Sequence, residues 1–501
     1  MQNKGLDNPT PASQPTAATA WRASAPGRAA EAAFDAVALA TFAAVSRMRT
    51  PMRRDRKGIA LIIAMATVAI LSLSITEFAY QTRVNVFIAA NARDDLKAYY
   101  LAKSGMNIGV VILAFQFELE KDPLIGRFMK RSNFQLYPLM NLFLTPFNTG
   151  SLQTPVGGLE LSQGATGFGG FHGSFDVHIE PEEGKINLNS FSKGTRNQAL
   201  LTQLCLLTFG EQHDDLFETE IGSGGGQKIE REQLVSNIVD WVDEDDQRSL
   251  LNEFCVPEGT SSGDEGGPYA RSDVNYEVKN AKMTTIEELR MVDGVSEAFM
   301  QRFADSFTVY PVDKVNLNLA NFWVVQSLLC SNVAGANQTT WPCRDPNVAT
   351  QVTYIALALD GLREFFSNPL NLLFYYMNSE SSPIVIDGAK QGQTVAYVNT
   401  RQLVRYIRAF KRSPELLAQF ISYSPTALQM LGPLAQQLGA AAPEIAIEFN
   451  ERDLLRSVTV DSPKIFKVIA EGTYGESRKT LVSVVDFSDI KNVKYLYWRE
   501  Y

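Results

Sequence analysis

The stretch RRDRKGIALIIAMATVAILSLSIT, residues 53–76, decides the fold of this chain. Four bases precede Gly58, and residues 59–76 then form an uncharged, largely apolar run. As an α-helix this run is about 27 Å long, close to the apolar thickness of a bilayer. A cleaved secretory signal is the alternative, but its apolar core is shorter and ends at small residues, whereas this run leads into EFAYQ. We therefore predict a membrane anchor with a cytoplasmic N-terminus.

The helical pattern continues beyond the anchor. Residues 77–117 contain no proline, and glycine occurs there only at 105 and 109. Apolar residues recur mostly at steps of three or four, namely at Phe78, Val84, Ile88, Ala92, Tyr99, Ala102, Met106 and Val110. We predict one helix over residues 59–118, roughly 85–90 Å long. Such a helix suits a filament subunit, in which the first half packs in the filament core and the second half backs a globular head.

Strand patterns lie at both ends of the remaining chain. They occur at 159–161, 174–179 and 185–188, and again at 457–460, 465–473 and 480–487. The turn EEG at 182–184 predicts a hairpin between the second and third of these strands. The intervening helical patterns are at 197–208, 230–242, 285–292, 296–306, 320–330, 350–366, 400–411, 414–422 and 425–438. This order predicts an α+β fold, with the long helix on a small antiparallel sheet and a large helical insert between the two strand sets.

The chain divides into six predicted parts. Residues 1–51 are either a disordered extension or lie before a true start at Met52, residues 52–58 are a leader, and 59–118 are the long helix with its membrane span at 59–76. The sheet is then divided between 119–190 and 441–501, around an insert at 191–440. A motif K-[IV]-N-L-N occurs at 185–189 and at 314–318. It divides the insert into units of about 191–312 and 313–440, although two matches of five residues can also arise by chance.

Charge and cysteine content limit the function classes. Residues 1–58 carry nine bases and four acids, which leaves residues 59–501 with 37 bases and 51 acids, a net charge of −14. Such a body repels phosphate backbones, which argues against nucleic-acid binding. The four cysteines show no CxxC spacing, which argues against zinc. Cys330 and Cys343 are one candidate disulfide and Cys205 and Cys255 the other, with buried free thiols as the alternative for the second pair.

An acidic cluster follows the helical pattern at 230–242. Between residues 214 and 265 there are fifteen acids and three bases. Calcium takes six to eight oxygen ligands from flexible loops, so carboxylates from two segments suit it. The EF-hand spacing fails at Gln247 and Arg248, and a solvated acidic surface is the alternative. The candidate ligands are Asp240, Asp243, Asp245, Asp246, Asp264, Glu265 and Asp273.

Residues 285–307 have the pattern of a helix-hairpin-helix, with VDGV at 292–295 as the hairpin. In DNA-binding versions the hairpin amides and nearby bases bind phosphate. Here Asp293 occupies the hairpin and Glu287, Glu288 and Glu297 lie nearby, which favours a structural or protein-contact role. No pattern of catalytic residues is evident, and we do not expect an enzyme.

Several motifs in one order resemble a known family. They are KGIALII at 57–63, DLKAYYLAKSG at 95–105, KINLN at 185–189, DWVDED at 240–245, TIEELRMVDGV at 285–295, VYP at 309–311 before VNLN at 315–318, and YWRE at 497–500. Together they resemble the minor pseudopilin K family of bacterial type II secretion over residues 53–501. The N-terminal extension is atypical, and residues 330–400 look longer than the family core, so partner contacts there are not carried over.

The resemblance implies a type IV pilin-like fold whose insert holds a SAM-like, helix-hairpin-helix unit. It implies that a prepilin peptidase cuts after Gly58 and methylates Ile59, and that calcium binds in the acidic loop. The family's role is at the tip of a periplasmic pseudopilus, where it initiates assembly and supports the export of folded proteins. The implied partners are minor pseudopilins I and J, with H as a further candidate, and the major pseudopilin. The implied location is the inner membrane, crossed once, with the body in the periplasm.

The residue at the fifth mature position agrees with a tip subunit. Most pilins have Glu there, which neutralises the N-terminal amine of the preceding subunit, and here the position is Ile63. A subunit with no predecessor has no use for that buried charge. Two rival functions stay open: a minor pilin of a type IV pilus, and a membrane-anchored periplasmic binding protein whose leader is never processed.

Overall fold

The computed structural model describes residues 58–132, 135–140, 144, 173–192, 198–208, 213–218, 228–252, 256–260, 265–267, 269, 276–335, 343, 345–367, 396–431 and 444–501. The predicted extension, most of the leader and the predicted strand at 159–161 lie outside these residues. The chain divides into two compact units, residues 1–89 and 90–501.

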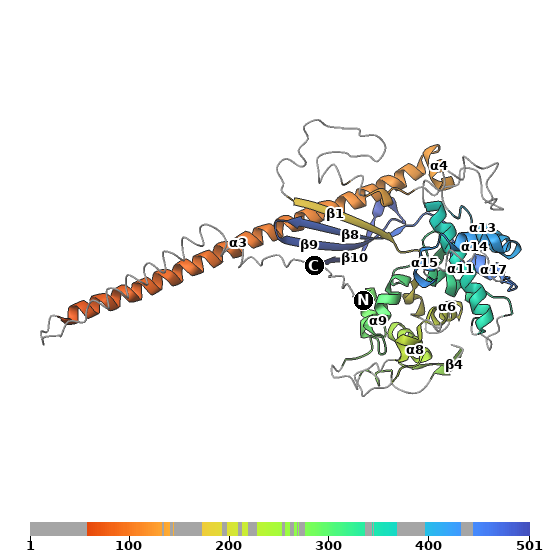
Figure 1. The fold of residues 1–501 in the computed structure, drawn as a ribbon, viewed down its shortest axis with the longest axis horizontal. Helices are drawn as coiled ribbons and strands as arrows, with labels where there is room; N and C mark the ends of the chain where they lie inside the picture. The colour runs from red at the N-terminus through yellow and green to blue at the C-terminus, as the bar shows by residue number, and fades with distance from the viewer. Residues whose placement is uncertain are drawn as a thin grey trace, which may run out of the picture. The chain divides into compact units, whose positions relative to one another are not determined.

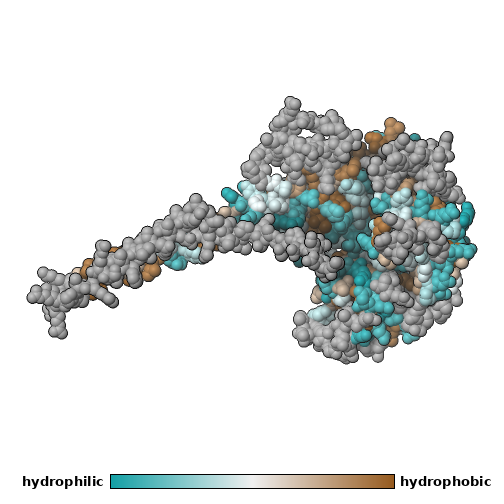
Figure 2. All heavy atoms as spheres, viewed as in Figure 1, coloured by the Kyte–Doolittle hydropathy of each residue, from teal (hydrophilic) through white to brown (hydrophobic). Residues whose placement is uncertain are grey.

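Helix α3 begins at Gly58 and ends at Lys121, three residues beyond the predicted end. Within the first unit its most apolar 18-residue window has a mean hydropathy of 2.5 and no buried residue, and by length and composition the helix is able to cross a membrane. Brown spheres mark these apolar side chains in Figure 2. The hydroxyls of Ser74 and Thr76 donate to the carbonyls of Ile70 and Ser72. These polar groups are therefore satisfied within the helix, as an apolar environment requires.

The second unit contains a four-stranded antiparallel sheet in the order β1-β8-β9-β10. The strands are β1 Gly173–Pro181, β8 Ile465–Tyr474, β9 Ser477–Asp486 and β10 Lys494–Glu500. A tight turn joins β8 to β9, and Gly475 adopts a φ of +60° there. β1 precedes the insert and β8 follows it. The two strands are thus neighbours in the sheet although 283 residues separate them in the sequence. The predicted α+β class, with a long helix and an antiparallel sheet, is confirmed.

The C-terminal half of α3 packs on this sheet (Figure 1). Ala98, Ala102 and Met106 are fully buried, and they face the inward side chains of β1, β8 and β9. Gly472 permits this close approach, because a Cβ at that position would lie 2.1 Å from the carbonyl oxygen of Ala98. Small residues on both elements therefore bring the helix backbone against the sheet.

The insert, which lies between β1 and β8 in the sequence, has a hydrophobic core of its own. The described elements there and around the sheet are α4 Ile125–Ser132, η1 Tyr137–Leu139, β2 Ile186–Asn187, η2 Leu188–Phe191, α6 Gln198–Thr208, α7 Asp214–Glu218, α8 Arg231–Val242, β3 Ser249–Leu251, β4 Pro257–Thr260, η6 Ile286–Met291, α9 Glu297–Phe303, η7 Ala304–Ser306, β5 Phe307–Thr308, β6 Val315–Asn316, α10 Phe322–Ser331, α11 Pro346–Ser367, α13 Arg401–Arg412, α14 Pro414–Ile421, α15 Pro425–Leu431, α17 Glu451–Ser457, β7 Val458–Thr459 and η10 Ile490–Asn492.

The repeated K-[IV]-N-L-N motif forms the same structure twice. Its first copy contributes β2, which pairs in parallel with β5, and its second copy contributes β6, which pairs in parallel with β7. The Asn189 side chain bonds both backbone groups of Met283, at 2.8 Å each. The Asn318 side chain likewise bonds both backbone groups of Tyr397, at 2.8 and 3.1 Å. We call residues 185–312 the first module and residues 314–460 the second module.

The predicted hairpin at residues 182–184 is wrong. β1 pairs with β8 and β2 pairs with β5, so the two strands do not pair with each other. The cause is Glu183, whose side chain accepts a hydrogen bond from the Ile465 amide at 2.8 Å and whose carbonyl accepts one from the Asn316 amide at 2.8 Å. These long-range bonds direct the chain from the sheet into the first module instead of back along β1.

Further elements differ from the prediction. β10 was not predicted, because all but one of its residues are exposed and its sequence shows no alternation. The ribbon β3–β4 lies in the acidic region that was predicted to be a loop, and α4 lies in the predicted loop after the long helix. The predicted helix at 285–292 is the 3₁₀ helix η6.

Candidate metal centre

The acidic cluster begins where α8 ends. Asp243 is the C-cap residue of α8, and its amide donates to the Val239 carbonyl. Trp241, in the last turn, is 2% exposed and its ring packs 5.6 Å from that of Tyr269. Trp241 thus anchors the last turn of α8 in the core and fixes the direction in which the acidic residues follow.

Three carboxylates from two segments converge beyond this helix end. One oxygen each of Asp243, Asp245 and Glu265 lie within 4.8 Å of one another. Asp243 is 1% exposed and Glu265 is 4% exposed, whereas Asp245 is exposed. The structure therefore brings together three of the seven predicted ligands.

The buried carboxylates lack hydrogen-bond partners. Oδ1 of Asp243 and both carboxylate oxygens of Glu265 are buried and unbonded within the part of the chain that the structure describes. A buried carboxylate without a partner is costly, because burial removes its hydration. Burial raises the pKa of Asp243 to about 8, with the charges of Asp240 and Asp245 adding to the effect. Burial and the charges of Asp240 and Asp243 likewise raise the pKa of Glu265 to about 8.

This arrangement suits a hard cation. A divalent ion between the three side chains would supply the missing partners and remove the repulsion between the carboxylates. Oxygen-only donors with one exposed member match calcium better than zinc, which prefers nitrogen and sulfur ligands. Calcium would complete its coordination with water or further oxygens, because three carboxylates alone do not provide six to eight ligands.

The other predicted ligands have different positions. Asp240 is 4% exposed, and its Oδ1 accepts a hydrogen bond from the amide of Ser249, the first residue of β3, at 3.0 Å. Burial raises its pKa to about 6. Asp240 thus ties the ribbon to α8 and lies outside the group of three. Asp246 is exposed and accepts a bond from Asn280 at 2.8 Å. Asp264 and Asp273 lie outside the described residues.

Asn280 is a site residue that the sequence did not identify. Its Nδ2 donates to the carbonyl of Asp245 at 3.0 Å, and its own Oδ1 is buried without a partner among the described residues. Its φ is 44°, the left-handed conformation that asparagine tolerates better than most residues. An isolated Asn in a polar stretch gives no sign of this role, because the bond bridges 35 positions in the chain.

The hairpin of the predicted helix-hairpin-helix supports the same region. Gly294 has a φ of +89°, and its Cα lies against Ile229. Asn237 of α8 donates to the Asp293 carbonyl at 2.9 Å. The Asp293 amide in turn donates to the Tyr269 hydroxyl at 3.3 Å. The described hairpin groups thus support α8, in agreement with a structural role.

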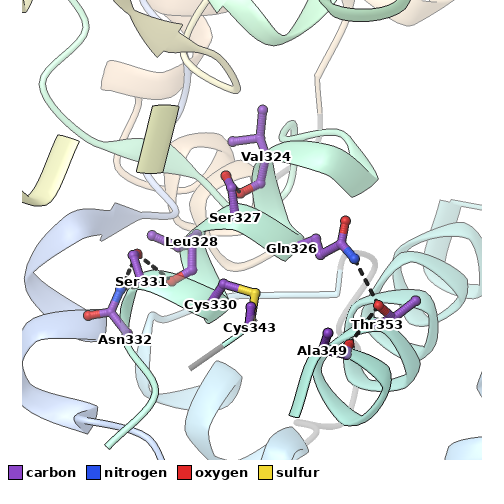
Figure 3. The surroundings of a disulfide bond; sticks show 10 residues. All are labelled: Val324, Gln326, Ser327, Leu328, Cys330, Ser331, Asn332, Cys343, Ala349 and Thr353. Carbon is purple, nitrogen blue, oxygen red and sulfur yellow. Dashed lines mark hydrogen bonds between the residues drawn. A yellow bond between two sulfur atoms is a disulfide. The ribbon is translucent and has the colours of Figure 1, made fainter. Parts of the chain in front are cut away.

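The second module contains a disulfide. Cys330 at the end of α10 is bonded to Cys343, with a Cα–Cα distance of 5.8 Å (Figure 3). Nearby, Gln326 of α10 donates to the Thr353 hydroxyl of α11 at 2.8 Å, so α10 is bonded both to Cys343 and to α11. Cys205 in the first module is also disulfide-bonded, and its predicted partner Cys255 lies outside the described residues.

Comparisons with known proteins give matches to one secretion system. Residues 184–312 match the family model described as "Type II secretion system (T2SS), protein K". The Type II secretion system protein K of Pectobacterium carotovorum subsp. carotovorum is 24% identical over 134 residues, which are 27% of this chain and 36% of that protein. The match thus spans about a third of that relative's length. The crystal structure of the GspK-GspI-GspJ complex from the enterotoxigenic Escherichia coli type 2 secretion system matches with a TM-score of 0.41 and 14% identity, over 82% of this chain and 99% of that chain.

Proposed function

We propose that this chain is a minor pseudopilin of a type II secretion system. The proposal starts from the match of residues 184–312 to the protein K model. The resemblance predicted from the sequence is confirmed by the family model and by the curated relative. The proposed place of the protein is the tip of the periplasmic pseudopilus, where it initiates assembly and supports the export of folded proteins. It is a structural subunit, and we propose no catalysis.

The observation that carries this proposal is that the two halves of α3 differ in exposure. Its first half exposes an apolar run, while Ala98, Ala102 and Met106 in its second half are fully buried. An apolar run of this length is stable in a bilayer or among the helices of a filament. The helix is therefore able to serve first as a membrane anchor and then as the stem of a filament subunit.

Maturation follows from the residues at the start of this helix. A prepilin peptidase would cut after Gly58 and methylate Ile59, and the inner membrane would hold the precursor with its body in the periplasm. The proposed partners are minor pseudopilins I and J, with H as a further candidate, and the major pseudopilin. Ile63 at the fifth mature position supports the tip position, since no preceding subunit offers an amine to neutralise.

Calcium is the proposed ligand of the acidic cluster. Asp243, Asp245 and Glu265 would hold the ion, and the unbonded, buried oxygens of Asp243 and Glu265 support this assignment. The ion would fix the segment after α8 against the segment that carries Glu265. Its proposed role is structural, because the ion would join two segments of the first module.

A substitution at Gly58 tests the proposed function. Gly58→Leu should leave an unprocessed precursor in the membrane and block secretion, because the peptidase cleft accepts a small residue before the cut. Gly58→Ala is the matched control and should be processed. Mass spectrometry of the membrane form should find N-methylated Ile59 in the wild type. Normal maturation of Gly58→Leu would remove the proposal, and an intact leader in the wild type would favour an unprocessed membrane-anchored binding protein.

A minor pilin of a type IV pilus is the nearest rival. It would share the processed leader and the long helix, so maturation alone does not exclude it. The match of residues 184–312 to the protein K model favours type II secretion. Deletion of the gene should therefore stop protein export while leaving surface pili in place.

A further inference from the structure

The sheet ends in an edge strand that has no outer neighbour. β10 pairs with β9 alone among the described residues. Tyr501 and Thr480 exchange two backbone hydrogen bonds, of 2.9 and 3.2 Å. In an antiparallel ladder the bonded residues alternate, so the backbone groups of Arg499 face β9 while those of Trp498 and Glu500 face the free side. The free edge thus offers amides and carbonyls to another strand.

Large apolar side chains gather on this edge. Tyr495 is 52% exposed, Leu496 37%, Trp498 40% and Tyr501 54%. Tyrosine, tryptophan and arginine are the residues most enriched where proteins bind one another. Three exposed aromatic side chains and one leucine within seven positions form an apolar patch, which marks the strand as an interaction surface.

The side chains of the edge are already held in place. The Tyr495 and Trp498 rings pack edge to face at 6.0 Å, and the Arg499 guanidinium lies 4.7 Å from the centre of the Tyr501 ring. Glu500 accepts a bond from the Tyr99 hydroxyl of α3 at 3.2 Å. A partner would therefore meet an ordered surface and would lose little side-chain entropy on binding it.

The register of β10 on β9 places Trp498 and Arg499 on opposite faces of the sheet. Trp498 is opposite Ser483, whose side chain is buried on the α3 side of the sheet, and Arg499 is opposite Val482 on the other side. A strand added to the edge would place alternate residues beside Trp498 and beside Arg499. Apolar residues fit the first position and carboxylates fit the second.

Charge argues against a second copy of this chain as the occupant. Residues 59–501 carry a net charge of −14, and residues 494–500 carry two bases and one acid. Two copies would thus bring together two bodies of like charge and two basic strands. A short acidic segment brings no such body with it, and at physiological salt it responds mainly to the charges within about 8 Å, which on this strand are two bases and one acid.

We propose that the outer edge of β10 binds an extended segment of another protein in which apolar and acidic residues alternate. The segment adds a fifth strand to the sheet, bonded to the outward amides and carbonyls of Trp498 and Glu500. The bulge between Tyr495 and Tyr497 limits the pairing to the C-terminal part of the strand. This surface does not depend on the role in secretion proposed above.

Peptide binding to the full chain in detergent micelles tests the proposal. The probe is a fluorescent heptapeptide of alternating Val and Glu, and its counterpart alternates Val and Lys. Fluorescence anisotropy should show that the Val–Glu peptide binds about tenfold more tightly or better, a difference of roughly 1.4 kcal/mol. Arg499→Glu should reverse this preference, whereas Arg456→Glu, on exposed α17, should keep it. No binding of the Val–Glu peptide, or equal binding of both peptides, overturns the proposal.

A proline at an outward position separates strand addition from binding by side chains. Glu500→Pro removes an amide that faces the free side, so the sheet should keep its melting temperature while the peptide loses about tenfold or more in affinity. Glu500→Gln keeps the amide and should bind like the wild type. If Glu500→Pro does not fold, Trp498→Ala gives a second test, with the same loss expected. Wild-type affinity in a folded Glu500→Pro would show that no strand is added at this edge, and wild-type affinity in Trp498→Ala would show that the peptide does not bind at this strand.

Discussion

The two modules share a frame, and a cluster of carboxylates distinguishes the described part of the first module from that of the second. In both, an Asn of the K-[IV]-N-L-N motif bonds the backbone of a distant residue, Met283 in the first module and Tyr397 in the second. The first module then brings unbonded carboxylates together at the end of α8, while the second joins α10 to Cys343 through a disulfide. Both modules thus contain disulfide-bonded cysteine, and the proposed calcium ion would add a second kind of cross-link to the first module.

The largest expected effect is on the covalent cross-link. Replacing Cys330 and Cys343 together with Ser should lower the free energy of unfolding by about 3 kcal/mol, because the disulfide closes a loop with a sequence separation of 13. Urea titration of the full chain in micelles measures this loss. The loss should be the same in calcium and in EGTA. A loss that changes with calcium would show that the two cross-links do not act separately.

Calcium should have an effect nearly as large on the first module. At a hundredfold excess over the Kd, binding to the folded state alone adds roughly 2.7 kcal/mol to the free energy of unfolding. Asp243→Asn should abolish this gain, because it removes a buried ligand, while Asp313→Asn, at an exposed acid outside the cluster, should keep it. In EGTA, Asp243→Asn should be no less stable than the wild type, since it removes a repelling charge. Thermal melting with and without calcium decides this. Identical curves for the wild type would show that the cluster is a solvated acidic surface that does not bind calcium.

The shared frame should be equally important in the two modules. Asn189→Ala removes bonds to both backbone groups of Met283 and to the Val309 carbonyl, and Asn318→Ala removes bonds to both backbone groups of Tyr397. Each variant should lose about 2 kcal/mol, because part-buried backbone groups are left without a partner. Comparison of the two variants by urea titration tests whether the motif is a true repeat. A large loss for one variant and none for the other would show that the likeness of the two copies is only local.

The smallest expected effect is a dependence on pH that only the metal-free protein shows. The pKa values of Asp243 and Glu265 are raised to about 8 in the folded chain, so the folded state binds more protons than the unfolded state between about pH 4 and pH 8. Stability from these groups is present at pH 5 and is lost as the pH rises to 8. In EGTA the melting temperature should therefore fall over this interval, and calcium should reduce the fall. A melting temperature that rises with pH in EGTA would contradict the burial of the two carboxyls.

Local patterns predicted the elements but not their partners. The long helix and the strands β8 and β9 were predictable because one face of each is apolar at a regular period. β10 was not, since its side chains are exposed on both faces. The pairing of β2 with β5 was missed because its partners Ile186 and Phe307 lie 121 positions apart.

The acidic site was predictable in outline only. Composition located the cluster, and the end of α8 gave Asp243 its place. Which acids can bind a cation depends on the path of the chain. Ser249 donates a hydrogen bond to Asp240, and Asn280 donates one to Asp246. The carboxylate of Glu265 is buried by tertiary packing, which the spacing of residues along the chain does not show.

Amide hydrogen exchange of the full chain in micelles, with EGTA and with millimolar calcium, tests most directly whether the first module depends on a cation. Calcium should slow exchange in peptides that cover residues 243–251 and 265–267, because the ion fixes these two segments against each other. Peptides from α10 and α11 in the second module should exchange at the same rate in both conditions, since the disulfide holds that region. Slower exchange confined to the first module is the predicted result. Unchanged exchange in the first module, or an equal change in both modules, would contradict it.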